Sequence, residues 1–176
     1  VFDPADDTFE TLSSTVAITQ HNKYRGSVAV NNEIIFAPYD QDVIGVFDVS
    51  TRIFTFVEIS DVFGQFASGI NNRYKFYDAI AVGNQVLFSP DQAQGIGVFD
   101  ALRHDFNLVD LYGTGFTMES VFAGGVATDG TVVFVPSNAA SVVTLDVAYC
   151  DELLACATGS YRAACGFNPS LIDPLT

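Results

Sequence analysis

Runs of hydrophobic residues, separated by short polar loops, recur along the chain at a nearly constant interval. The clearest copy reads Val-Ala-Val-Asn-Asn-Glu-Ile-Ile-Phe-Ala-Pro and is followed, after a polar loop, by Ile-Gly-Val-Phe-Asp. A second copy is close to the first, and a third is weaker. The three copies span 28–38 with 44–48, 80–90 with 96–100, and 126–136 with 142–146.

The copies keep their internal spacing to the residue. Pro38, Pro90 and Pro136 are 52 and 46 residues apart (90 − 38 and 136 − 90), and the aspartates that end the cores follow the same steps. Length variation is therefore confined to the loops between the cores. This regularity predicts an array of repeated structural units.

Each core has the pattern of a hairpin followed by two further strands. An apolar run crosses a turn pair, such as Asn31-Asn32 or Asp129-Gly130, and continues into a second run rich in β-branched and aromatic residues. A third run ends in an aspartate, and a fourth follows at 53–59 and at 105–111. Four short strands in about 45–50 residues are typical of one blade of a β-propeller.

We therefore predict an all-β protein built from antiparallel four-stranded propeller blades, about three complete and one partial. The runs 34–36 and 132–135 are apolar throughout, as expected for sheets that are buried on both faces. An open antiparallel sandwich is the alternative. The predicted array covers 1–147, with units at about 1–12 (partial), 23–59, 75–111 and 121–157, and a short irregular or helical tail that contains cysteines covers 148–176.

The charge of the chain narrows the choice of partners. Seven basic residues stand against 21 acidic ones, which gives a net charge of −14, so a nucleic-acid partner is excluded because phosphates would be repelled. No apolar run approaches the roughly 20 residues of a transmembrane segment.

The chain begins inside a repeat, so we expect a processed piece of a longer precursor, completed by a protein partner or by another segment of that precursor.

The sequence contains no recognisable catalytic, cofactor or metal motif. His21 and His104 are the only histidines, and they fall at unrelated positions of the repeat, so structural roles are expected for both. No zinc spacing, nucleophile elbow or phosphate-binding glycine loop is present. The loop residues Asp40, Asp42 and Asp91 could offer oxygen atoms to calcium, but they do not form a dense calcium-binding loop.

The most regular polar and aromatic positions are expected to be structural. An aspartate that ends a strand can accept hydrogen bonds from the N–H groups of the following turn. A phenylalanine two residues before each proline is expected to be buried on a second strand, which the proline must end for lack of an N–H donor. These repeat positions are Asp3, Asp48, Asp100 and Asp146, Phe36, Phe88 and Phe134, and Pro38, Pro90 and Pro136.

All three cysteines lie in the tail, at Cys150, Cys156 and Cys165. Local disulfide formation in a secreted or organelle-lumenal compartment is favoured, with reduced, buried thiols as the alternative. A Cys150–Cys156 bridge is excluded, because six steps of either strand or helix separate the two Cα atoms by more than the roughly 7 Å that a disulfide spans. Cys165 is therefore expected to pair with one of the other two.

The repeated core, with its Val-Ala-Val-x-Asn-x-Ile-Ile-Phe-Ala-Pro and Ile-Gly-Val-Phe-Asp segments, resembles kelch-like propeller repeats. It is more closely similar to repeats of large propeller-like proteins of dinoflagellate-type microalgae. Propellers carry many activities. We favour a non-enzymatic interaction module, a peripheral subunit or scaffold in a larger assembly; the alternative is part of a ligand-binding (sugar-binding) or enzymatic (lyase-type) propeller.

Overall fold

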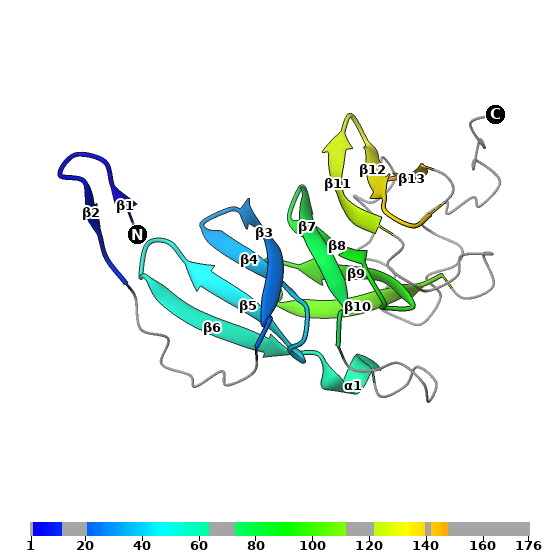
Figure 1. The fold of residues 1–176 in the computed structure, drawn as a ribbon, viewed down its shortest axis with the longest axis horizontal. Helices are drawn as coiled ribbons and strands as arrows, with labels where there is room; N and C mark the ends of the chain where they lie inside the picture. Colours follow the sequence, from blue (N-terminus) through cyan, green and yellow to red (C-terminus); the bar gives the residue numbers. More distant parts are fainter. Residues whose placement is uncertain (1, 12–20, 64–72, 112–121, 140–141, 148–176) are drawn as a thin grey trace.

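A computed structural model shows that the regular structure in the described part of the chain is almost all antiparallel β-sheet (Figure 1). The structure describes residues 2–11, 21–63, 73–111, 122–139 and 142–147. Within these residues, two sheets have four strands, one has three and one has two, and one helix of four residues is present. The predicted all-β fold with antiparallel four-stranded blades is confirmed.

In each sheet every strand pairs with the next strand of the chain. Blade 1 consists of β3 (Tyr24–Val30), β4 (Glu33–Pro38), β5 (Val43–Asp48) and β6 (Ile53–Glu58). Blade 2 consists of β7 (Phe76–Val82), β8 (Gln85–Pro90), β9 (Gly95–Asp100) and β10 (Asp105–Asp110). The described part of blade 3 consists of β11 (Phe122–Thr128), β12 (Thr131–Pro136) and β13 (Val143–Asp146). The other elements are the N-terminal hairpin of β1 (Phe2–Asp3) and β2 (Thr8–Phe9) and the helix α1 (Ser60–Phe63).

The turns within the hairpins explain why the cores fold in this way. The φ angle is positive at each of these turns: it is 53° at Asn31, 58° at Gly83, 34° at Asp129 and 82° at Gly130. Asparagine, aspartate and glycine adopt this left-handed conformation at low cost, and it matches the twist of two paired strands.

The repeats superimpose in register as well as in sequence. In each blade, the phenylalanine of the second strand lies opposite one residue of the first strand and one of the third. The triplets are Ser27, Phe36 and Gly45; Ala79, Phe88 and Gly97; and Gly125, Phe134 and Val143.

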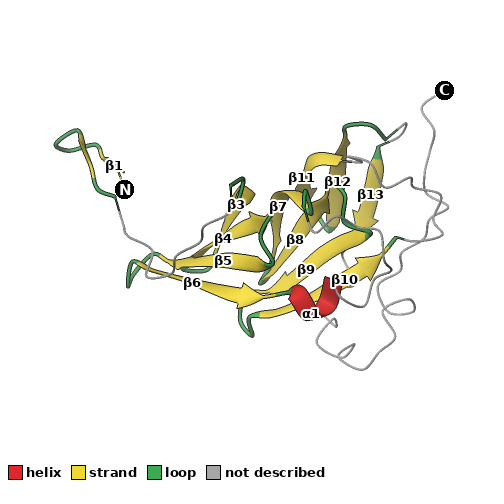
Figure 2. Ribbon diagram, turned by 60° about the horizontal axis from the view of Figure 1, so that its bottom comes forward, coloured by secondary structure: helices red, strands yellow, loops and turns green. Residues whose placement is uncertain are grey.

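The first strands of the three blades, β3, β7 and β11, lie next to one another, and the sheets stand side by side (Figure 2). Asp78 of β7 lies between Gly26 and Gly124, which hold the same repeat position in the neighbouring blades. A Cβ atom on Gly26 or Gly124 would come within 2.3 Å or 2.7 Å of the Asp78 carboxylate oxygens. Only glycine therefore leaves room for Asp78 at this point.

The apolar core lies between the blades. Ile35, Ile44 and Val46 of blade 1 pack with residues of blade 2 that include Phe76 and Phe88. A second cluster joins the other side of blade 2 to blade 3 and contains Ile80, Leu87, Ile96, Phe122 and Phe134. At both of these contacts, the aliphatic face of one blade packs on the aromatic face of the next blade.

This stacking of successive sheets is a propeller arrangement and replaces the sandwich alternative. The sequence did not predict α1, which follows blade 1. The expected fourth strand of the third unit and the tail with Cys150, Cys156 and Cys165 lie outside the described residues.

Candidate functional site

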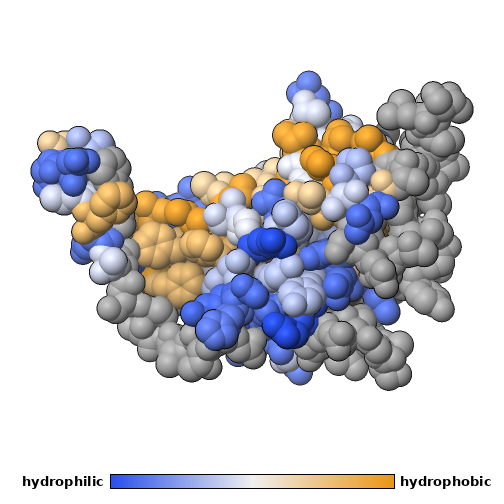
Figure 3. Space-filling view, viewed as in Figure 1, coloured by the Kyte–Doolittle hydropathy of each residue, from blue (hydrophilic) through white to orange (hydrophobic). Residues whose placement is uncertain are grey.

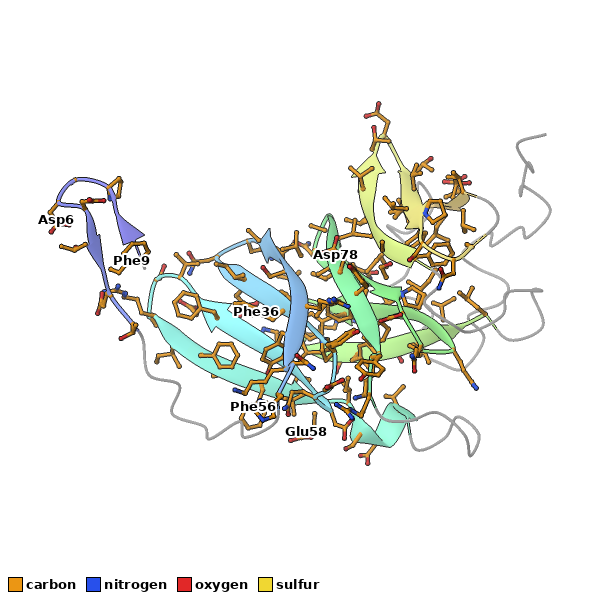
Figure 4. The ribbon with its side chains drawn as sticks, in the orientation of Figure 1. Asp6, Phe9, Phe36, Phe56, Glu58 and Asp78 are labelled. Atoms are coloured by element: carbon orange, nitrogen blue, oxygen red, sulfur yellow. The ribbon has the colours of Figure 1, made fainter. Side chains whose placement is uncertain are left out.

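The most distinctive surface of the molecule is the aromatic face of blade 1. We use this name for Ile34, Phe36, Phe47, Phe54 and Phe56. Strand pairing places them on one side of the sheet, since Ile34 lies opposite Phe47, Phe47 opposite Phe54, and Gly45 opposite both Phe36 and Phe56. Figure 3 shows an apolar area over this blade beside the N-terminal hairpin, and Figure 4 labels Phe36 and Phe56.

The corresponding face of blade 2 is covered by a neighbouring sheet. The counterparts Val86, Phe88 and Phe99 are 0% exposed, because the aliphatic face of blade 1 covers them. The five residues of the aromatic face of blade 1 are all only half-buried. The expectation that Phe36 is as buried as Phe88 and Phe134 is therefore wrong for Phe36, since no described element packs over that side of blade 1.

Two rings of this face and the adjacent Tyr24 ring are already arranged as in the covered blade. Tyr24, Phe36 and Phe54 have centroid separations of 5.7–6.1 Å, and Phe76, Phe88 and Phe106 in blade 2 have separations of 5.4–6.2 Å. Gly45 makes room for the first trio, because a Cβ atom there would lie 2.7 Å from the Phe54 ring. The face is thus preorganised for a second sheet.

At the opposite end of the array, no described element covers the aliphatic face of the last blade. We use the name aliphatic face of blade 3 for Val126, Val133, Val135 and Thr144, which strand register places on one side of the sheet. Val126 and Val135 are 59% and 49% exposed. Their blade 1 counterparts, Val28 and Ala37, pack into the core between blades 1 and 2.

The N-terminal hairpin does not cover the aromatic face. Phe9 of β2 is 80% exposed, and Figure 4 shows it apart from Phe36 and Phe56. An ion pair between Glu10 and Arg52 joins the hairpin region to the turn after β5.

A network of charged groups joins the loops at one end of the blades. Asp40 accepts hydrogen bonds from the Tyr74 amide at 3.1 Å and from Arg73 at 3.3 Å. The fully buried Lys75 places its Nζ 2.9 Å from Oδ1 of Asp42. This contact is an ion pair without hydrogen-bond geometry, because Oδ1 has no hydrogen-bond partner among the described residues. Two of the three calcium candidates thus face cations, and the described residues contain no group of three or more His, Cys, Asp or Glu side chains able to hold a metal ion.

Arg25 lies in the same region, near two tyrosine rings. Its guanidinium carbon is 4.7 Å from the ring centre of Tyr39 and 4.3 Å from that of Tyr77, and it donates a hydrogen bond to the Tyr39 hydroxyl at 2.9 Å. Burial, followed by the nearby Asp91 carboxylate, raises the pKa of Tyr39 to about 12. Burial also raises the pKa of Tyr24 to about 12. This cluster could not be predicted from the sequence, since its members come from three separate loops and strands.

We expect these two tyrosines to ionise late in an alkaline titration. Their folded pKa values lie above the ordinary value of 10.0, so the stability they contribute is present below about pH 10 and is lost as the pH rises toward 12. Ultraviolet absorbance of the phenolate should show a late phase that disappears in the Tyr24→Phe/Tyr39→Phe variant. A late phase of unchanged size in that variant would contradict the assignment.

The repeated aspartates lie at strand ends. Asp48 Oδ1 accepts the Thr51 amide at 2.7 Å, and this hydrogen bond lowers the pKa of Asp48. Asp100 Oδ1 accepts the amides of Leu102 and Arg103 at 2.9 and 3.1 Å. Asp3 and Asp146 end β1 and β13.

His104 links two blades. Its ring stacks on Phe99 at 5.8 Å, and its Nε2 lies 3.1 Å from both carboxylate oxygens of Glu33 in blade 1. His21 is exposed. The two histidines lie in different parts of the fold and do not form a common site.

The fold defines a β-propeller-type protein, and comparison with solved structures agrees. The chain is similar to virginiamycin B lyase from Staphylococcus aureus, at 13% identity and a TM-score of 0.55, over 74% of this chain and 41% of that one. It is also similar to the hydrazine synthase of Kuenenia stuttgartiensis, at 9% identity and a TM-score of 0.51, over 78% and 37%. The chain thus spans less than half the length of either protein. No protein-family model and no curated protein matches it.

Proposed function

We propose that the chain is a non-enzymatic propeller module that binds another protein through the aromatic face of blade 1. One observation carries this proposal: the blade 2 counterparts of Ile34, Phe36, Phe47 and Phe54 are buried by a neighbouring sheet, whereas these four residues are only half-buried in blade 1. Contiguous, partly exposed apolar surface of this kind is typical of interaction sites.

The chemistry of the face indicates what would bind there. In blade 2, the equivalent surface is filled by Ile35, Ile44, Val46 and other aliphatic side chains of a β-sheet. The partner should therefore present a sheet with small and branched aliphatic residues. A charged peptide is a poor occupant, because none of the five residues of the aromatic face carries a charge.

Site-specific photocrosslinking tests this proposal. A photoreactive benzoylphenylalanine in place of Phe56 should crosslink to a protein when the full chain is expressed in its native cell. The matched control replaces Thr55, which is exposed on the opposite side of the same strand. Crosslinking at position 56 that is absent, or that is equal at position 55, would contradict the proposal.

A second candidate, a sugar-binding or lyase-type site, is favoured by one observation at the loop end. Oδ1 of Asp91 and Nε2 of Gln41 are buried and have no hydrogen-bond partner among the described residues. Arg25, with its two tyrosine neighbours, lies in the same region. Calorimetric titration with a panel of oligosaccharides, on the wild type and on Arg25→Ala and Asp91→Ala, would decide: binding that both variants abolish supports this candidate, and no binding removes it.

A further inference from the structure

The two ends of the blade array carry the two halves of one interface. The aromatic face of blade 1 is open at one end, and the aliphatic face of blade 3 is open at the other. Inside the chain, an aliphatic face packs on an aromatic face twice, between blades 1 and 2 and between blades 2 and 3. The two open faces are therefore complementary in the same way as the faces that pack between blades within the chain.

From this continuity we infer that a second copy of the chain occupies the aromatic face of blade 1, by presenting the aliphatic face of its own blade 3. The inference rests on the proposed function and names the partner. Val126, Val133 and Val135 of one copy then meet Phe36 and Phe54 of the other. The contact is head-to-tail, so two such contacts can close a ring around a two-fold axis.

The extent of the chain leaves room for this arrangement. It covers 41% of the lyase and 37% of the hydrazine synthase on which it superimposes. More than half of each of these proteins therefore has no counterpart in the chain. A second copy matches the open aromatic face in surface chemistry, because the aliphatic face of its blade 3 resembles the aliphatic faces that pack between blades inside the chain.

Charge sets the conditions under which the contact forms. The residues that define the two open faces carry no charge, whereas the chain as a whole has a net charge of −14. Two copies therefore repel each other at long range while their faces attract at short range. Screening above about 0.15 M salt should weaken the repulsion and strengthen the association.

The test uses analytical ultracentrifugation of the full chain with two single variants, Phe56→Arg on the aromatic face and Val135→Arg on the aliphatic face. The wild type should self-associate between about 1 and 100 μM, more strongly as salt increases. Each variant alone should associate at least about tenfold more weakly, because burying an unpaired arginine in either face is unfavourable. Leu102→Arg, at a position 68% exposed in the turn between β9 and β10, is the matched control and should behave as the wild type.

Mixing the two variants gives the decisive result. Phe56→Arg keeps a working aliphatic face and Val135→Arg keeps a working aromatic face, so an equimolar mixture should form a heterodimer that neither variant forms with itself. Circular dichroism of each variant verifies that it is folded; a pair that proves unfolded is replaced by Phe47→Ser and Thr144→Arg, to which the same expectations apply.

Three results would overturn the inference. A monomeric wild type under all these conditions excludes the second copy, while crosslinking of another protein at position 56 would leave the proposed function standing. Loss of association in Phe56→Arg but not in Val135→Arg indicates contact between two aromatic faces. A mixture that stays monomeric excludes head-to-tail packing.

Discussion

Replacement of Phe88 by alanine is expected to lower the free energy of unfolding by about 3–5 kcal/mol. Phe88 is 0% exposed and packs against the rings of Phe76 and Phe106. Gly97 lies opposite it on β9 and has no side chain that could move into the space, so the substitution leaves a cavity. Urea unfolding followed by circular dichroism measures the change.

The same substitution at Phe36 is the matched comparison. Phe36 has the same strand register, but it is half-buried, so its truncation should cost about half as much. Phe134→Ala, at a site that is also 0% exposed, should resemble Phe88→Ala. If Phe36→Ala were as costly as Phe88→Ala in dilute, monomeric protein, the aromatic face of blade 1 would have to be covered within the chain.

Removal of the Asp42 carboxylate is expected to destabilise the fold by about 1–3 kcal/mol. The substitution Asp42→Ala leaves the Lys75 ammonium without this counter-charge, and the Lys75 side chain is only 1% exposed. The Asp42 side chain is 39% exposed, so solvent already weakens the pair and the lower part of this range applies in high salt. The change in urea midpoint reports the loss.

Lys75→Met distinguishes charge from packing. Methionine fills a similar volume and removes the buried charge, so this variant should be near wild type in stability. In the double variant Asp42→Ala/Lys75→Met, the cost of losing Asp42 should largely disappear. An Asp42→Ala penalty that persists in the Lys75→Met background would show that the carboxylate acts on some other group.

The sequence predicted the blades well because their signals are local. The turn pairs at Asn31-Asn32 and Asp129-Gly130, and the prolines that end the second strands, fix hairpin boundaries without reference to distant residues. Runs that are apolar on both sides predicted sheets covered on both faces. Strand order followed directly, since each strand pairs with its neighbour in the chain.

The candidate surface could not be predicted in the same way. The core sequences around Phe36 and Phe88 are nearly alike, and the difference in exposure comes only from the presence or absence of a neighbouring sheet. The space for Asp78 between Gly26 and Gly124 likewise depends on three blades meeting. Contacts of this kind, between distant segments, do not produce a periodic pattern in the sequence.

The stacking of the blades also determines how the chain should unfold. Blade 2 has a neighbour on each face, whereas blades 1 and 3 each have one among the described elements. In such a linear array, stability is nearly a sum of unit and nearest-neighbour energies. Backbone amides of β8 and β9 should therefore exchange with solvent most slowly, and opening should start at the ends and move inward. Blade 2 is therefore expected to open last, because blades 1 and 3 shield its two faces from solvent.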